Sequence, residues 1–203
     1  VSIAVHTTFC MTLVLCVVFT IVGISATPFL LRFMSMPDDV IGEATEYLMI
    51  YFSGVSGLMI YNMGAGVLRA VGDSKRPLYF LVFSACVNTV LDLVFVVKLH
   101  WGIAGVAWAT VIAQGLSAVL ILVVLFRANG AYRLVLSKMK TDRGALQEIV
   151  RIGFPSAVQQ TVTAFSNVFV QSYINSFGSN AMAGWSAYGK IDQFMMLPMQ
   201  SVA

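Results

Sequence analysis

Long apolar runs alternate with short polar segments along the chain, and each run has the length of a membrane-spanning helix. A helix needs about 20 apolar residues to cross a bilayer, and lipid offers no partner for backbone groups that are not paired within the protein. The pattern therefore predicts an all-α fold, a polytopic transmembrane helical bundle. The predicted spans cover about residues 5–31, 44–70, 77–97, 101–126 and 146–174, and a sixth begins near Ala181.

One polar stretch, residues 129–148, is much longer than the others and breaks the hydrophobicity of the chain. A break of this kind is typical of a boundary between two independently packed units. We expect residues 1–130 to form helices of a first lobe, residues 131–146 to be the linker between lobes, and residues 147–203 to begin a second lobe.

Composition and charge agree with a membrane protein and predict its orientation. Hydrophobic residues make up 59% of the chain and charged residues only 10%, which is far from the balance of a soluble domain. Segments 69–76 and 127–151 hold nine of the twelve Lys and Arg residues. Because basic loops stay on the inner side, we expect both segments to be cytoplasmic in a multi-pass protein of the cell membrane. The chain starts on Val1 and ends within an apolar run, so we also expect a longer polypeptide.

Asp92 lies well inside the apolar run of residues 77–97. A carboxylate at such a depth costs several kcal/mol, so an acidic residue there usually has a function. Ser84, Asn88 and Asp92 are spaced by four residues, which stacks them on one face of a helix. That face must contact protein or water instead of lipid.

The surroundings of Asp92 predict a site for a small cation. Desolvation disfavours the ionised carboxylate and so favours uptake of a proton near neutral pH; alternatively Asp92 stays ionised and binds sodium. Asn88, Thr110 and Tyr47 fall at comparable depth and could supply further oxygen ligands. The competing interpretation is a structural Asp92 satisfied by Asn88 and backbone groups.

A second polar feature runs along the span at 146–174, where uncharged polar residues recur every three or four positions. The stripe predicts either interhelical hydrogen bonds or one wall of a water-filled cavity. Adaptable methionines on the next helix could complete an apolar substrate cavity, although membrane methionines also make ordinary packing contacts. The candidate cavity residues are Gln160, Thr163, Asn167, Gln171, Met195 and Met199.

Small residues recur at a spacing of four along the span at 101–126. Such a ladder predicts a closely packed neighbouring helix, because small side chains let two backbones approach. The ladder consists of Gly105, Ala109, Ala113 and Ser117.

No sequence motif points to an enzyme. HExxH and GxSxG are absent, and the three cysteines have neither CxxC spacing nor a neighbouring histidine. We therefore expect no catalytic activity, no cofactor, no bound metal beyond a sodium ion at Asp92, and no nucleic-acid partner.

Several short motifs together resemble the multidrug and toxic compound extrusion (MATE) family. They follow the family's order of helices four to seven across almost the whole chain. The motifs are Tyr61–Asn62, GVLRAVGDSKRP at 66–77, NTVLD at 88–92, GIAGVAWATVIAQ at 102–114, GFP at 153–155 and Phe177–Gly178.

The resemblance implies a fold of two six-helix lobes related by pseudo-twofold symmetry, of which this chain covers about helices 3 to 8 of 12. It places the cation site of the first lobe at Asp92, Asn88, Tyr47 and Thr110. Some members carry a Glu in the seventh helix where this chain has Thr163, so the chain is similar to the DinF-like branch.

The function implied is antiport: a proton or sodium gradient drives export of bulky, apolar or cationic drug-like compounds by alternating access, in a protein expected to act as a monomer. The alternative is a flippase for lipid-linked saccharides on a related fold. Anionic head groups would require several basic residues inside the spans. The predicted spans hold almost no Lys or Arg, and Lys190 is the exception.

Overall fold

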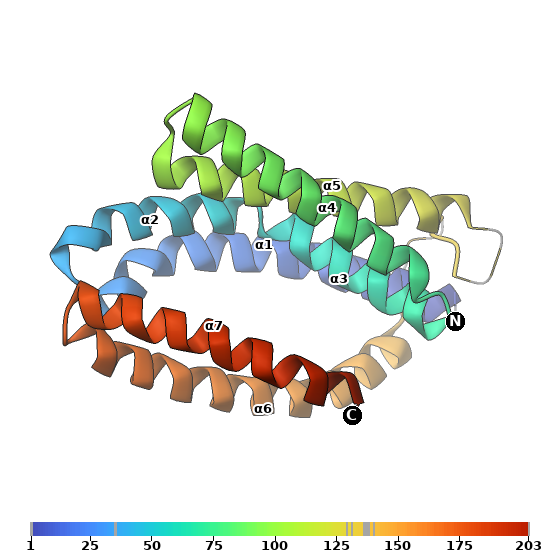
Figure 1. The fold of residues 1–203 in the computed structure, drawn as a ribbon. Coiled ribbons are helices and arrows are strands. Elements are labelled where there is room, and N and C mark those ends of the chain that lie inside the picture. The colour runs from blue at the N-terminus through green and yellow to red at the C-terminus, as the bar shows by residue number, and fades with distance from the viewer. Residues whose placement is uncertain are drawn as a thin grey trace.

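The structure is a computed structural model (Figure 1). It describes residues 2–34, 36–128, 130, 132–135, 139 and 141–202, with the side chains of residues 194 and 196–202 left aside. Within these residues the fold is all-helical. The elements are α1 (Ser2–Phe33), α2 (Asp38–Ser53), α3 (Val55–Ala70), α4 (Lys75–Leu93), the π-helical turn η1 (Val94–Lys98), α5 (Gly102–Arg127), α6 (Arg143–Asn175) and α7 (Ser179–Val202).

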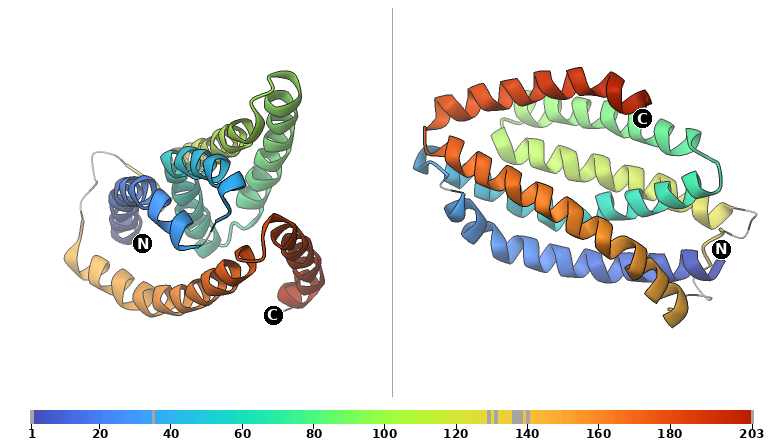
Figure 2. Two further views of the ribbon diagram at one scale, coloured as in Figure 1. Left: turned by 90° about the vertical axis from the view of Figure 1, so that its left-hand side faces the viewer. Right: turned by 90° about the horizontal axis from the view of Figure 1, so that it is seen from below.

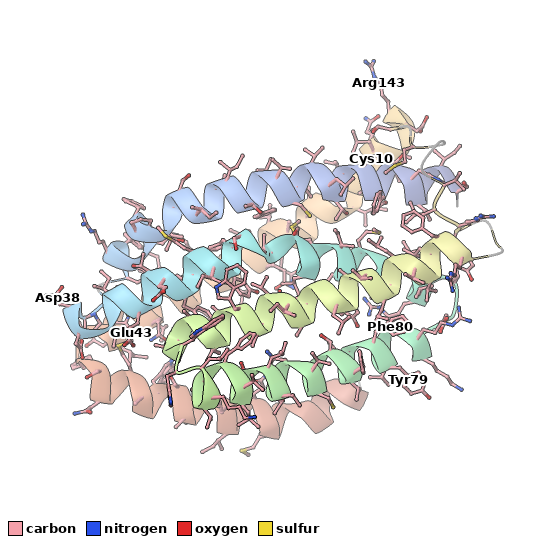
Figure 3. The ribbon with its side chains drawn as sticks, turned by 90° about the horizontal axis from the view of Figure 1, so that it is seen from above. Cys10, Asp38, Glu43, Tyr79, Phe80 and Arg143 are labelled. Atoms are coloured by element: carbon pink, nitrogen blue, oxygen red, sulfur yellow. The ribbon has the colours of Figure 1, made fainter. Side chains whose placement is uncertain are left out.

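The helices lie nearly side by side in an elongated bundle. α4 and α5 are on one side, α1, α2 and α3 are in the middle, and α6 and α7 form a pair on the other side (Figures 1 and 2). Asp38 and Glu43 of α2 lie at one end of the bundle, and Arg143 of α6 lies at the opposite end (Figure 3). The acidic start of α2 and the basic start of α6 therefore lie at opposite ends of the bundle.

The described helices differ in whether they are long and apolar enough to cross a membrane. α1, α4 with η1, and α5 are each long and apolar enough, and α2 with α3 makes a fourth span if the bent pair is counted as one. α6 and α7 are helical at the positions of the two remaining predicted spans, but neither is apolar enough over its described residues to count as a membrane span. The polar stripe of α6 explains its lower hydropathy, since carboxamide and hydroxyl side chains recur along the helix.

The predicted span at 44–70 is broken into two helices at Gly54, with a bend of 48° between them. A side chain at Gly54 would run into Val111 of α5. Farther along, a Cβ atom on Gly57 would lie 2.9 Å from the backbone nitrogen of Gly115. Glycines thus let α3 approach the backbone of α5, as expected for small residues in a membrane helix.

The segment after α5 folds back onto the first helices. Leu134 is 1% exposed and joins a buried cluster with residues of α1, α3 and α5. Its N–H donates to the carbonyl of Leu125 at 3.0 Å, and the N–H of Val135 donates to Nε2 of the buried His6 at 3.1 Å. α6 then begins at Arg143, within the segment predicted as linker. This part of the predicted linker is therefore fastened to α1 and α5.

Candidate functional site

Two contacts fix how α4 and α5 lie against each other. The hydroxyl of Ser84 donates to the carbonyl of Ala113, and a Cβ atom on Gly105 would lie 3.0 Å from Cβ of Phe95. The helices are therefore antiparallel. The small-residue ladder on α5 is buried at Gly105, Ala109, Ala113 and Ser117, which confirms the predicted close helix neighbour.

Asn88 and Asp92 lie on α4 between those two contacts. Asp92 Oδ1 and Asn88 Nδ2 are both buried, and neither has a hydrogen-bond partner. Both residues are half-buried as a whole, so the cost of an unpaired polar atom, about 1–3 kcal/mol, applies to these two enclosed atoms. The structure therefore does not give Asp92 Oδ1 the partner that a purely structural role would require.

Thr110 lies on α5 in the same interval and falls at about the level of Asn88. Its hydroxyl donates to the carbonyl of Val106 at 2.9 Å, and the residue is half-buried. A hydroxyl that donates in this way keeps lone pairs free to accept a hydrogen bond or to ligate a cation. Thr110 thus lies at a level comparable to that of Asn88 along the two helices, and its contact with Asp92 or Asn88 stays a prediction.

Tyr47 lies on α2 and faces α5. It lines an apolar groove of about 660 Å³ together with Ile103 and Val106 of α5, and Val106 is one turn before Thr110. Its ring stacks on Tyr51 with the ring centroids 6.2 Å apart. The described lining of this groove includes no residue of α4, and Asp92 Oδ1 accepts no hydrogen bond from Tyr47. A direct contact of Tyr47 with the Asp92 site therefore stays a prediction.

Gln114 is a polar residue that the sequence analysis did not assign to the site. Its neighbours Ala113 and Gly115 contact α4 and α3 respectively, so the side chain of Gln114 is directed between those two helices. Its Oε1 atom is buried without a hydrogen-bond partner. The sequence feature that could have pointed to Gln114 is its spacing of four residues from Thr110, the same spacing as between Asn88 and Asp92.

The turn that follows Asp92 is π-helical. η1 runs from Val94 to Lys98, and the N–H of Leu99 donates to the carbonyl of Val94 at 3.1 Å. Short π-helical segments are rare in proteins overall, but those that occur are often found at functional sites. The apolar pattern at 77–97 gives no sign of this change.

The candidate substrate cavity on α6 and α7 is not brought together in the same way. Gln160, Thr163, Asn167 and Met195 are exposed, and the side chain of Met199 lies outside the described residues. Gathering of these residues around a substrate stays a prediction.

The end of α6 is linked to the end of α1 through Asn175, and Gln171 at the end of the polar stripe bonds to Asn175 within α6. Nε2 of Gln171 donates to Oδ1 of Asn175 at 2.8 Å, and Nδ2 of Asn175 donates to the carbonyl of Met34 at 2.8 Å. Asn175 is 2% exposed, so this pair attaches α6 to the end of α1.

Several helices that are long and apolar enough to cross a bilayer indicate a multi-span membrane protein, and the half-buried Asp92 on one of them marks a candidate site. Comparison with known proteins then gives the family. Residues 1–94 match the family model MatE. The probable multidrug resistance protein YpnP of Bacillus subtilis (strain 168) is 33% identical over 176 residues, which cover 87% of this chain and 39% of YpnP. The chain belongs to the MATE family.

Two solved structures agree with this assignment over almost the whole chain. A multidrug resistance MATE family transporter of the MOP superfamily in its inward-facing conformation matches with a TM-score of 0.86 and 28% identity, over 96% of this chain and 44% of that one. An outward-facing conformation matches with a TM-score of 0.80 and 27% identity, over 98% of this chain and 44% of that one. The chain thus spans less than half the length of these relatives.

Proposed function

We propose that the protein containing this chain is a secondary active antiporter that exports bulky, apolar or cationic drug-like compounds. The coupling cation, a proton or a sodium ion, binds at Asp92. The family assignment supports multidrug efflux as the activity, since YpnP is described as a probable multidrug resistance protein.

The observation that carries the proposal is the buried, unpaired Oδ1 of Asp92 between α4 and α5. A proton would turn the carboxylate into a neutral acid and remove the cost of a buried charge. A sodium ion would do so by coordination, with Asn88, Thr110 and Tyr47 as the further oxygen donors. Either event changes the charge of the site by one unit, and this change can bias a two-state equilibrium between conformations.

Alternating access is the mechanism by which this charge change would move a substrate. Similar transporters are described in inward-facing and outward-facing conformations. With segments 69–76 and 127–151 cytoplasmic, Asp92 lies nearer the outer end of its helix, where a cation entering from outside would reach it. Thr163 in place of a Glu favours coupling through the first lobe, as in the DinF-like branch, and we propose a monomer as the transporting unit.

The test uses the full-length protein in liposomes, with proton and sodium gradients imposed separately. Asp92→Asn keeps the shape of the side chain and removes the charge, and it should abolish gradient-driven efflux of a fluorescent cationic dye. Asp39→Asn is the matched control, because Asp39 is an exposed carboxylate in the first turn of α2, and it should transport as wild type. Efflux by Asp92→Asn at the wild-type rate would contradict the proposal.

A further inference from the structure

Besides Asp92 Oδ1, the described residues hold two more buried polar atoms without partners, and these two are chemically complementary. Asn88 Nδ2 is a hydrogen-bond donor, and Gln114 Oε1 is an acceptor. They lie on adjacent helices, α4 and α5. The pair differs from Asp92 Oδ1, which is an acceptor that calls for a cation or a donor.

The packing of α4 on α5 puts these two atoms within reach of each other. Ser84 contacts Ala113, so Gln114 starts one residue beyond the level of Ser84, and Asn88 lies about 7.5 Å from it along the axis at about 1.5 Å per residue. Side chains on a helix tilt toward its N-terminus. Because the helices are antiparallel, that tilt carries the Gln114 carboxamide toward Asn88, and rotation about its side-chain bonds can close the remaining gap.

The orientation of the Asn88 carboxamide decides what it offers to Asp92. A carboxamide has one oxygen and one NH₂ group on opposite sides. Its oxygen can point at a cation held by Asp92 only if its NH₂ group points away, and in a buried site that NH₂ group then needs its own acceptor. Gln114 Oε1 is the unpaired buried acceptor that the described residues of α5 supply.

We propose that Gln114 is a positioning residue of the cation site. Its Oε1 accepts a hydrogen bond from Asn88 Nδ2, which holds Asn88 Oδ1 toward Asp92. The inference rests on the proposed cation site at Asp92. Cation binding to Asn88 Oδ1 polarises the carboxamide and strengthens its N–H donor, so Gln114 stabilises the cation-bound site more than the empty one.

The test is a double-mutant cycle in the full-length protein in liposomes, with efflux measured against external sodium and, separately, against pH. Gln114→Met keeps the length of the side chain and removes the acceptor. It should raise the half-saturating cation concentration about tenfold, equivalent to about 1.4 kcal/mol, with the maximal efflux rate and the KM for the dye unchanged. In an Asn88→Ala background the same substitution should shift half-saturation less than twofold, because the pair is already broken.

Ser117→Ala is the matched control. Ser117 is buried on α5 one turn beyond Gln114, and its hydroxyl donates to the carbonyl of Gln114 within the same helix. It should leave half-saturation unchanged. Wild-type cation dependence in Gln114→Met, or an equal shift with and without Asn88, would overturn the positioning role. If Asp92→Asn keeps coupled efflux, the proposed function itself fails, so the two failures are distinct.

Discussion

Gly57 is where α3 meets the backbone of α5, and a single methyl group there should separate the two helices. A Cβ atom on Gly57 would lie 2.9 Å from the nitrogen of Gly115 and 3.1 Å from the carbonyl carbon of Gln114. Both atoms belong to the backbone, so no side chain can rotate away. Overpacking of this kind costs about 1–3 kcal/mol. We predict that Gly57→Ala is less stable by this amount than a Gly→Ala change at an open site of α3, and that it weakens cation binding, since the displaced backbone carries Gln114.

Gly66→Ala on the same helix provides the reference. A Cβ atom on Gly66 has nothing within 4 Å, and the gain in helix propensity from Gly to Ala, about 1 kcal/mol, applies to both sites. The difference between the two variants therefore isolates the cost of helix separation. The assay is reversible unfolding of the full-length protein in detergent micelles, followed by cation-dependent efflux. Equal stability of Gly57→Ala and Gly66→Ala would refute the close-packing argument.

Two further predictions concern hydrogen bonds that join segments distant in the sequence. His6→Ala removes the acceptor of the Val135 N–H, which should lower the free energy of unfolding by about 1–3 kcal/mol and speed cleavage of the linker by trypsin. His6→Gln should restore slow cleavage. Equal cleavage rates in all three proteins would contradict this role of His6. Tyr61→Phe removes the hydrogen bond from the Tyr61 hydroxyl to the carbonyl of Pro77, 2.8 Å long and buried. It should lower the free energy of unfolding by about 1–2 kcal/mol, while the same change at the exposed Tyr79 should have no effect; matching losses would argue against it.

Helix positions could be predicted from hydrophobicity, because a bilayer constrains both length and apolar character. The run at 101–126 becomes α5, Gly102–Arg127, and the run at 5–31 becomes α1, Ser2–Phe33. The break at Gly54 could not be predicted, since it depends on Val111 of another helix occupying the space beside it. Small residues indicate close packing but give no bend angle.

The candidate site was predictable where it rests on spacing within one helix. Asn88 and Asp92 are four residues apart, and the structure leaves a buried, unpaired atom on each. Gln114 was missed because its direction follows from the contacts of Ala113 with α4 and of Gly115 with α3. The fastening of the linker by His6 was missed for the same reason, since it joins residues 129 positions apart.

The central claim is that a cation bound at Asp92 crosses the membrane in exchange for the exported compound. The most direct measurement records sodium or proton flux and dye flux together in liposomes that contain the full-length protein and no imposed cation gradient. A dye gradient across wild-type protein should drive the coupling cation in the opposite direction, and Asp92→Asn should show no cation movement. Dye-driven cation flux that persists in Asp92→Asn would contradict the account.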